Sequence, residues 1–288
     1  MKRNLLILTL GTIALLGLPS CSTNVSIPSA TTVETAAAPT SASLKMGGSS
    51  STVGVIQTLA TSYESTSQNT KITQLEPGQS ETVIAGVKQQ LIDIGAISKT
   101  LKPEDNDGTL EFREVAHDAL LVATHPTVTG VKNLTTKDIQ AIYSGTLTNW
   151  KELGGPDAKI VVLDRPEDES AKRLLRKHYL GKDLKNSPEA VVLKKEGELI
   201  EAIQSTPYSI GAFSLAYAIS HKVPVNRLGL NNVEPTAENV KAGKYQMVRQ
   251  IEILWHKNAS ESTQGLIKYI FSPSGTNALE KSGFVVSK

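Results

Sequence analysis

The stretch Leu44-Lys-Met-Gly-Gly-Ser-Ser-Ser-Thr-Val53 decides how the folded part of this chain begins. A short apolar run ends in two glycines, and hydroxyl residues then lead into apolar residues that recur every three or four positions as far as Tyr63. This spacing predicts a helix capped by Ser and Thr, and glycine allows a sharp turn and a close approach to a ligand. The free N–H groups at such a helix start favour an anion. An anion site and an ordinary capped turn are both consistent with this stretch alone.

The beginning of the chain has the pattern of a secretory signal. Basic Lys2 and Arg3 precede an apolar run from Leu5 to Leu18, which is too short to span a bilayer comfortably. Cys21, the only cysteine among 288 residues, follows shortly afterwards and resembles the lipidated cysteine of a bacterial lipobox. We therefore expect a signal peptide over residues 1–20 and lipidation of Cys21. A simple secretory peptide with an incidental cysteine is the alternative.

Residues 21–43 consist largely of Ser, Thr, Ala and Pro. Because this composition cannot bury enough apolar surface to fold, we expect a lipidated N-terminus followed by a flexible linker. Acyl chains on Cys21 would hold the protein at a membrane surface. The segment therefore predicts export across the cytoplasmic membrane and a lipid-anchored location, either periplasmic or at the cell surface.

Charge and motifs argue against several function classes. Without Lys2 and Arg3, the 30 basic residues become 28 and equal the 28 acidic ones, so no basic excess recruits nucleic acid. The five histidines are scattered without the spacing of metal ligands. The sequence has no Gly-x-Ser-x-Gly elbow, P-loop or paired-cysteine motif. We expect no metal, no cofactor, no nucleic-acid partner and no enzymatic activity.

Short apolar runs alternate with helical patterns along the rest of the chain. Residues 92–97, 160–163 and 209–213 have the composition of buried strands, and apolar residues at helical spacing lie between them. Alternation of short strands with helices is typical of an α/β fold with mostly parallel sheets.

Several motifs, in order along nearly the whole mature chain, resemble the phosphate-binding proteins of phosphate ABC importers, which belong to the type II periplasmic-binding-protein family. The strongest match is the run from Thr135 to Gly155. The others are Ser49-Ser-Ser-Thr-Val53, Asp93-Ile-Gly95 with Ser98-Lys99, Ala116-His-Asp118, Ile210-Gly211, Pro235-Thr-Ala-Glu-Asn239 and Ser272-Pro-Ser-Gly275.

This resemblance implies two α/β lobes that close over a ligand and are joined by crossing strands. Lobe 1 would take residues 44–125 plus 250–288, and lobe 2 would take residues 126–249. The crossings would lie near Thr124–Pro126 and Met247–Ile251. The resemblance further implies a monomer that binds inorganic phosphate or a similar oxyanion and delivers it to ABC transporter permease subunits.

Two other functions stay open at this point. One is a binding or sensor protein of the same fold whose ligand is another oxyanion or a protein. The other is an anchored phosphohydrolase, for which the sequence shows no pattern of catalytic His and Asp partners.

The resemblance and the chemistry of phosphate together predict the ligand-binding residues of lobe 1. Ser50, Ser51 and Thr52 would donate hydrogen bonds at the first helix start, and Ser80 would donate from the start of the second helix. Asp93 would accept the proton of a hydrogen phosphate and so exclude sulfate, which carries no proton near neutral pH. A strand-end cap on a neighbouring backbone is the alternative role for Asp93.

Lobe 2 departs from the family's pattern at its expected ligand loop. Arg165 would supply a forked, charge-assisted contact, and Ser170 a further donor. The family's pattern here is Arg-x-x-Gly-Ser-Gly-Thr-Arg, whereas this chain lacks the glycines and the threonine and carries three acids in the loop, Glu167, Asp168 and Glu169. We expect these three acids to stabilise the start of a helix and to point outward.

Overall fold

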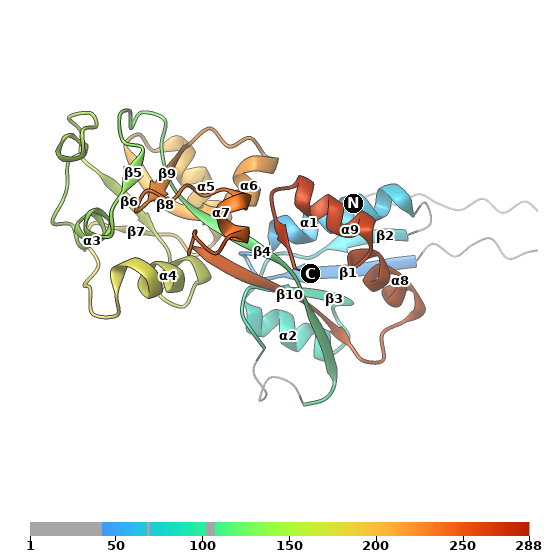
Figure 1. The fold of residues 1–288 in the computed structure, drawn as a ribbon. Helices are drawn as coiled ribbons and strands as arrows, with labels where there is room; N and C mark the ends of the chain where they lie inside the picture. The colour runs from blue at the N-terminus through green and yellow to red at the C-terminus, as the bar shows by residue number, and fades with distance from the viewer. Residues whose placement is uncertain (1–41, 68–69, 102–106, 288) are drawn as a thin grey trace, which may run out of the picture. The chain divides into compact units, whose positions relative to one another are not determined.

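The computed structural model describes residues 42–67, 70–101 and 107–287 (Figure 1). The predicted signal peptide, the Cys21 lipidation site and the predicted linker as far as residue 41 lie outside the described residues. Ala42 and Ser43, which the composition assigns to the linker, already form the start of the first strand. None of the helices in these three ranges is long and apolar enough to cross a membrane.

Strands and helices alternate along the described residues. The strands are β1 (Ala42–Gly48), β2 (Thr70–Gln74), β3 (Ile94–Ile97), β4 (Leu110–Thr124), β5 (Asn133–Leu134), β6 (Val161–Asp164), β7 (Val191–Val192), β8 (Ser209–Ser214), β9 (Asn226–Leu230), β10 (Val248–His256) and β11 (Val285–Val286). The helices are α1 (Val53–Thr66), α2 (Ser80–Lys88), α3 (Thr136–Ser144), η2 (Trp150–Leu153), α4 (Ser170–Leu175), η3 (Arg176–Leu180), α5 (Glu196–Ser205), α6 (Leu215–Ser220), α7 (Ala237–Lys241), α8 (Glu261–Ile270) and α9 (Pro273–Lys281).

The main strands join in the order β2-β1-β3-β10-β4-β8-β6-β7 (Figure 1). Pairing is parallel on both outer sides, between β1 and its neighbours β2 and β3 and between β6 and its neighbours β7 and β8. It is antiparallel at the centre, where β4 and β10 run from one side to the other. The prediction of an α/β fold with parallel sheets and two crossing strands is therefore confirmed.

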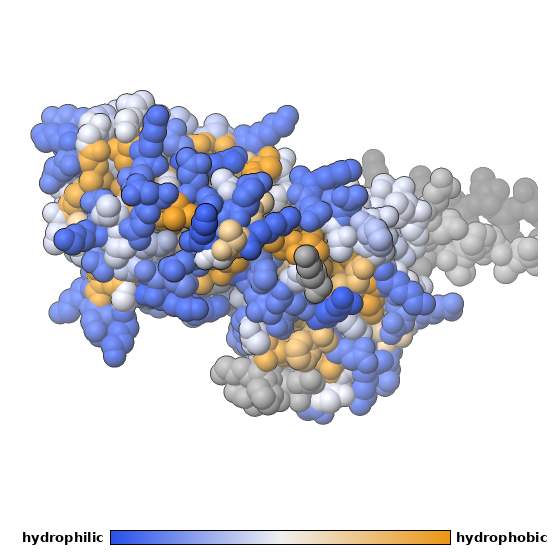
Figure 2. Space-filling model, viewed as in Figure 1, coloured by the Kyte–Doolittle hydropathy of each residue, from blue (hydrophilic) through white to orange (hydrophobic). Residues whose placement is uncertain are grey.

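Each side of the sheet has its own apolar core. In lobe 2, one cluster takes residues from Ala119 to Met247. In lobe 1, α1, α8 and α9 cover one face of β1, β3 and β10, whereas α2 covers the opposite face, because alternate residues of a strand point to opposite faces. On the face seen in Figure 2, hydrophilic residues separate the apolar areas of the surface.

β4 passes from one core to the other within a few residues. Val115 and Ala116 pack in lobe 1, whereas Ala119 to Ala123 pack in lobe 2. The first crossing therefore lies between Ala116 and Ala119, earlier than the predicted Thr124–Pro126. The sequence carries no mark at this point, because a single strand of 15 residues makes the crossing without a break.

β10 makes the second crossing close to its predicted place. Met247 packs in lobe 2 and Ile251 in lobe 1. The register with β4 also shifts here: Ile251 pairs with Ala116, but Glu252 pairs with Glu114. One residue of β4 is therefore left over, which is the pattern of a β-bulge.

The glycines at the end of β1 serve close packing and not a sharp turn. Both lie in the strand without a positive φ. A Cβ atom on Gly48 would lie 2.5 Å from Thr52 Oγ1 and 3.1 Å from Ile56 Cγ1, and one on Gly47 would lie 2.9 Å from Ile92 Cδ1. Gly48 thus allows the start of α1 to sit directly against the strand that positions it.

We predict that Gly48→Ala lowers the free energy of unfolding by about 1–3 kcal/mol, because the added methyl group overpacks the contact with Thr52 and Ile56. Urea unfolding followed by circular dichroism measures this change. Gly197→Ala in α5 is the matched control, since a Cβ atom there meets nothing within 4 Å. The control is expected to gain about 0.5–1 kcal/mol from helix propensity; equal effects of the two substitutions would contradict the packing argument.

Candidate functional site

Three loops meet at the carboxyl ends of parallel strands, which is where ligands bind in open α/β sheets. The loop Ser49–Thr52 follows β1, and Ser98 follows β3, the parallel neighbour of β1. The loop Arg165–Glu169 follows β6 in lobe 2. Across the lobes, Arg165 donates a hydrogen bond to Ser50, and Gln79, which precedes α2 in lobe 1, donates one to Glu169.

Ser51 and Ser98 form a buried pair of hydroxyls at the end of β1 and β3. Their Oγ atoms lie 2.6 Å apart, and Ser51 Oγ lies 3.1 Å from Ser49 Oγ. Ser51 is one of the predicted ligand-binding residues, and its contact with a ligand stays a prediction. Ser98, which the sequence argument did not include among the ligand-binding residues, lies beside it.

Ser50 links the first helix start to the second and to lobe 2. Its N–H donates to the carbonyl oxygen of Gly78 over 3.0 Å, and its Oγ accepts a hydrogen bond from Arg165 Nη2 over 3.3 Å. Gly78 lies just before α2, whose first residue is the half-buried Ser80. The structure thus brings the start of α2 to the site, and direct contact of Ser80 with a ligand stays a prediction.

Thr52 is committed to the backbone and does not face the space between the lobes as a donor. Its Oγ1 lies 3.0 Å from the carbonyl oxygens of both Ser49 and Ala96, and its N–H donates to Ser49 over 2.8 Å. The prediction of a ligand contact from the Thr52 hydroxyl is therefore wrong. The hydroxyl instead fastens the helix start to β3.

Asp93 lies at the wrong end of β3 for contact with the ligand. It precedes this strand, whereas Ser98 follows it. Its carboxylate accepts a hydrogen bond from the N–H of Lys45 over 2.7 Å and lies 3.5 Å from Thr263 Oγ1. Asp93 is thus the strand-end cap of the alternative interpretation, and its predicted role as acceptor for phosphate is corrected.

Arg165 is buried, with only 4% of its surface exposed, and only one of its guanidinium nitrogens has partners. Nη2 donates to Ser50 and forms an ion pair with Glu169 Oε2 over 2.9 Å. Nε and Nη1 have no hydrogen-bond partner. Since buried donors are nearly always paired, these two nitrogens indicate a missing acceptor at this place.

Glu169 is buried next to Arg165 and contacts both lobes. Its Oε2 pairs with Arg165, and its Oε1 accepts a hydrogen bond from Gln79 Nε2 of lobe 1 over 3.2 Å. The prediction that the acids of this loop point outward agrees with the exposure of Glu167 and Asp168, but it is wrong for Glu169.

The cation that follows in α4 is not available to a ligand. Lys172 is fully buried and pairs with Asp164 over 2.5 Å. Glu167 forms an ion pair with Arg176 over 2.8 Å, and hydrogen bonding from Arg176 lowers the pKa of Glu167 to about 2. Of the cations around this loop, Arg165 is thus the one with unpaired donors.

Arg249 of β10 joins both crossing strands to lobe 2. It donates to Asp118 of β4 over 2.6 and 3.0 Å and to Glu196 of α5 over 2.7 and 3.0 Å. Its Nη1 also donates to Ser170 Oγ over 3.2 Å, and Ser214 donates to Asp118. Ser170 is buried and its hydroxyl oxygen accepts a hydrogen bond from Arg249, so its predicted donation to a ligand stays a prediction.

In the cluster of Arg249, Asp118 and Glu196, the opposite charges counteract the effect of burial on the pKa values. Burial raises the pKa of Asp118, while the positive charge of Arg249 counteracts the rise. Burial acts to lower the pKa of Arg249, but the charges of Glu196 and Asp118 raise it overall. The short contacts on both sides of the guanidinium fit a cation held between two carboxylates.

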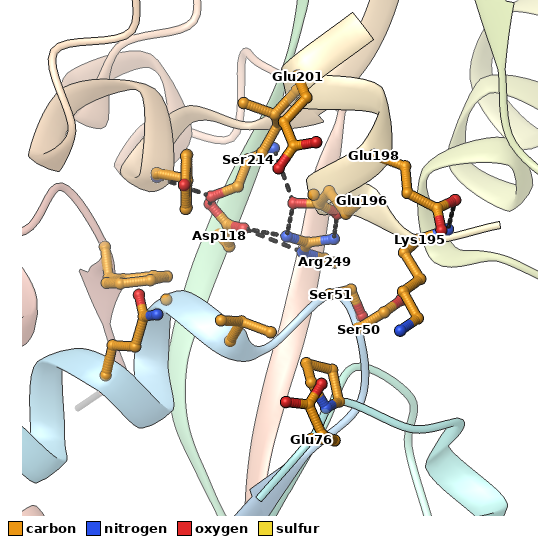
Figure 3. Close-up of a pocket in the computed structure, with 18 residues that line it drawn as sticks. Ser50, Ser51, Glu76, Asp118, Lys195, Glu196, Glu198, Glu201, Ser214 and Arg249 are labelled. Carbon is orange, nitrogen blue, oxygen red and sulfur yellow. Dashed lines mark hydrogen bonds and ion pairs between the residues drawn. The ribbon is translucent and has the colours of Figure 1, made fainter. Parts of the chain in front are cut away.

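Two cavities meet at Arg249. One, of about 360 Å³, is lined by Ser50 and Ser51 on one side and by Glu196 and Ser214 on the other (Figure 3). The other, of about 310 Å³, has Ser98 and Ser170 in its wall. The second cavity also has the cations Lys99, Arg173 and Lys177 in its lining and no carboxylate. Ser51 lines the first cavity and Ser98 the second, and their Oγ atoms lie 2.6 Å apart.

The donors around Ser51, Ser98 and Arg165 suit an anion, whereas the cavity of about 360 Å³ also has five carboxylates in its lining, those of Glu76, Asp118, Glu196, Glu198 and Glu201. Within residues 42–67, 70–101 and 107–287, no group of three or more His, Cys, Asp or Glu side chains is placed to hold a metal ion. Hydroxyls, two helix starts and a buried guanidinium are donors, which complement an oxyanion.

Three residues of the site were not predicted from the sequence as ligand-binding residues: Ser98, Glu169 and Arg249. The position of Ser98 directly after a strand was a usable signal, because ligands bind at carboxyl ends. Arg249 stands in an otherwise mostly apolar strand, which indicates a buried ion pair. Nothing in the sequence distinguishes Glu169 from an exposed acid at a helix start.

Known proteins give an independent comparison. The sequence model of the PBP superfamily domain matches residues 33–274. The phosphate-binding protein PstS of Borreliella burgdorferi is 30% identical over 250 residues, which cover 84% of this chain and 89% of the relative. PstS of Bacillus subtilis is 27% identical over 246 residues, which cover 84% of this chain and 78% of the relative.

Solved structures agree with these relatives. A crystal structure from Clostridium perfringens, assigned as a phosphate ABC transporter substrate-binding protein with bound phosphate, has a TM-score of 0.74 and 27% sequence identity. The match covers 85% of this chain and 100% of that chain. The resemblance seen in the motifs is confirmed: the chain belongs to the PBP superfamily, within the family of the phosphate-binding protein PstS.

Proposed function

We propose that this chain binds inorganic phosphate, or a closely similar oxyanion, between its lobes as the substrate-binding component of an ABC importer. The observation that carries this proposal is the pair of Arg165 donors, Nε and Nη1, which are buried without a partner. Leaving a buried charged donor unpaired is costly, so a ligand with several acceptor oxygens is favoured there. The phosphate in the Clostridium perfringens structure and the names of the PstS relatives support the same ligand.

The proposed ligand contacts come from both lobes. Ser50 and Ser51 at the start of α1, with Ser80 at the start of α2, would donate from lobe 1. Ser98 joins them because its hydroxyl lies 2.6 Å from that of Ser51. From lobe 2, Arg165 would donate the charged contacts, and Ser170 would take part through its hydrogen bond with Arg249.

Transport follows from the family, which consists of substrate-binding transport proteins and not of enzymes. We propose that lobe 1, up to the crossing in β4 and again from the crossing in β10, closes against lobe 2 over the ligand. The closed protein, acting as a monomer, would then deliver phosphate to the permease subunits.

The location of the protein is proposed from the sequence. Residues 1–20 have the pattern of a signal peptide, and Cys21 that of a lipidation site, so we propose an extracytoplasmic lipoprotein tethered to the membrane. A linker over residues 21–41 would let the two lobes reach the permease while the acyl chains stay in the bilayer.

A second candidate keeps the fold and changes the ligand. Glu169 lies buried against Arg165, and a carboxylate at this place opposes an anion. We infer from this observation a second candidate, a binding or sensor protein of the same fold whose ligand is another oxyanion or a protein. Titration of the purified protein with phosphate and sulfate separates the two candidates, because only the first requires binding of phosphate.

Arg165→Gln is expected to weaken phosphate binding by about 10- to 150-fold, since hydrogen bonds to charged groups contribute about 1.5–3 kcal/mol. Isothermal titration calorimetry measures the change. Arg227→Gln, an exposed arginine of β9, is the control and should leave the Kd unchanged. Because the single variant leaves Glu169 buried without its partner, Arg165→Gln/Glu169→Gln provides a second, charge-balanced variant. Unchanged affinity in both folded variants would refute the role of Arg165.

Ser98→Ala is expected to weaken phosphate binding by about two- to tenfold, the range of one neutral hydrogen bond of about 0.5–1.5 kcal/mol. Asp93→Asn is the companion variant at the opposite end of the same strand. It should leave the preference for phosphate over sulfate unchanged, because Asp93 is bonded to Lys45 and not to the site. Competition titrations with the two anions report both effects. A loss of discrimination in Asp93→Asn would contradict the placement of the site.

Cys21→Ser is expected to move the protein from the membrane fraction to the soluble fraction, because it removes the attachment point of the acyl chains. Fractionation of cells followed by immunoblotting measures the distribution. Ser22→Ala, next to the cysteine, is the control and should stay with the membrane. If Cys21→Ser also remains in the membrane fraction, lipidation at Cys21 is ruled out as the anchor.

A further inference from the structure

Glu169 occupies a place that resembles that of a bound anion. Its carboxylate lies 2.9 Å from Arg165 Nη2 of lobe 2 and accepts a hydrogen bond over 3.2 Å from Gln79, the residue that caps α2 in lobe 1. Only 6% of its surface is exposed. A carboxylate that contacts both an arginine of one lobe and a helix start of the other makes the contacts that an oxyanion between the lobes would make.

The buried cations around the site already have carboxylate partners without any ligand, and three cations face four carboxylates. Arg165 pairs with Glu169, Lys172 pairs with Asp164, and Arg249 pairs with Asp118 and Glu196. Every buried Arg or Lys in the described part of the chain thus has a carboxylate partner. An oxyanion that enters must therefore take the place of a carboxylate or lie next to one.

Glu169 satisfies its arginine only in part. It contacts a single guanidinium nitrogen, while Nε and Nη1 of Arg165 remain buried without partners. Asp118 and Glu196, in contrast, each contact two nitrogens of Arg249. Among these ion pairs, only the pair of Arg165 and Glu169 leaves buried donors free. An anion with more acceptor oxygens could therefore form more hydrogen bonds with Arg165 than Glu169 does.

We propose that Glu169 is an internal anion that competes with the ligand for Arg165 and so sets the affinity of the site for oxyanions. This inference rests on the proposed function. Because Glu169 belongs to the chain, its effective concentration at Arg165 is high. A tetrahedral oxyanion displaces Glu169 because it can reach the unpaired donors as well.

The test compares Glu169→Gln with wild type by calorimetric titration with phosphate and, separately, with sulfate. The substitution keeps the shape of the side chain and removes the competing charge. We expect both anions to bind tighter by about tenfold, equivalent to about 1.4 kcal/mol. Asp168→Asn is the matched control: it removes the same charge from the neighbouring, exposed residue and should change either Kd by less than about twofold, since exposed charges are screened.

Each outcome of the titrations supports or overturns the competition between Glu169 and the ligand. Tighter binding in Glu169→Gln supports the inference, and a merely structural defect would not produce it. Equal or weaker phosphate binding overturns it while the proposed function stands. Weaker phosphate binding with a gain of sulfate binding also overturns it, because Glu169 would then accept a proton from the ligand. If neither protein binds phosphate, the wild-type titration alone refutes the proposed function, and the inference falls with it.

Discussion

The ion pairs of Arg249 fix the two crossing strands against two helix starts of lobe 2. This side chain comes from one crossing strand, contacts Asp118 of the other, and reaches Glu196 and Ser170 at the starts of two helices of lobe 2. Burying three charges costs solvation energy, which only near-ideal geometry offsets. Replacing one partner would leave an unpaired charge inside the protein, so the cluster specifies how the strands and helix starts must meet. The loop Arg165–Glu169, which precedes α4, is positioned in part by the contact between Arg249 and Ser170.

The residues of lobe 1 and lobe 2 at the site differ in how many of their hydrogen-bonding groups have partners. In lobe 1 the hydroxyl of Thr52 forms hydrogen bonds with backbone carbonyls, and the hydroxyls of Ser51 and Ser98 form a hydrogen bond with each other. In lobe 2 the guanidinium of Arg165 is only partly used. A protein that binds and releases its substrate needs such an imbalance, because fully satisfied groups gain little from a ligand.

The sequence was informative where a single local pattern determines the outcome. The run from Leu44 to Tyr63 correctly predicted a strand, a hydroxyl-rich loop and a helix, and the ordered motifs identified the family. Asp93 and Thr52 were misplaced because the choice between a ligand and the backbone of a neighbouring strand depends on tertiary contacts. Glu169 shows the same limit: an acid at a helix start is usually exposed, and only the packing of Gln79 and Arg165 around it buries its carboxylate.

The bulge between β4 and β10 bears on how the lobes can turn. At the crossing the ladder skips one residue, so that Ile251 faces Ala116 while Glu252 faces Glu114. A regular ladder resists torsion, because twisting it strains every hydrogen bond in the row, whereas a bulge leaves a residue unpaired and lets the strand bend locally. The leftover residue of β4 thus lies next to the ion pairs of Arg249, and the strand can bend locally there. The closure that we propose for the two lobes would then be concentrated at this one step of the backbone.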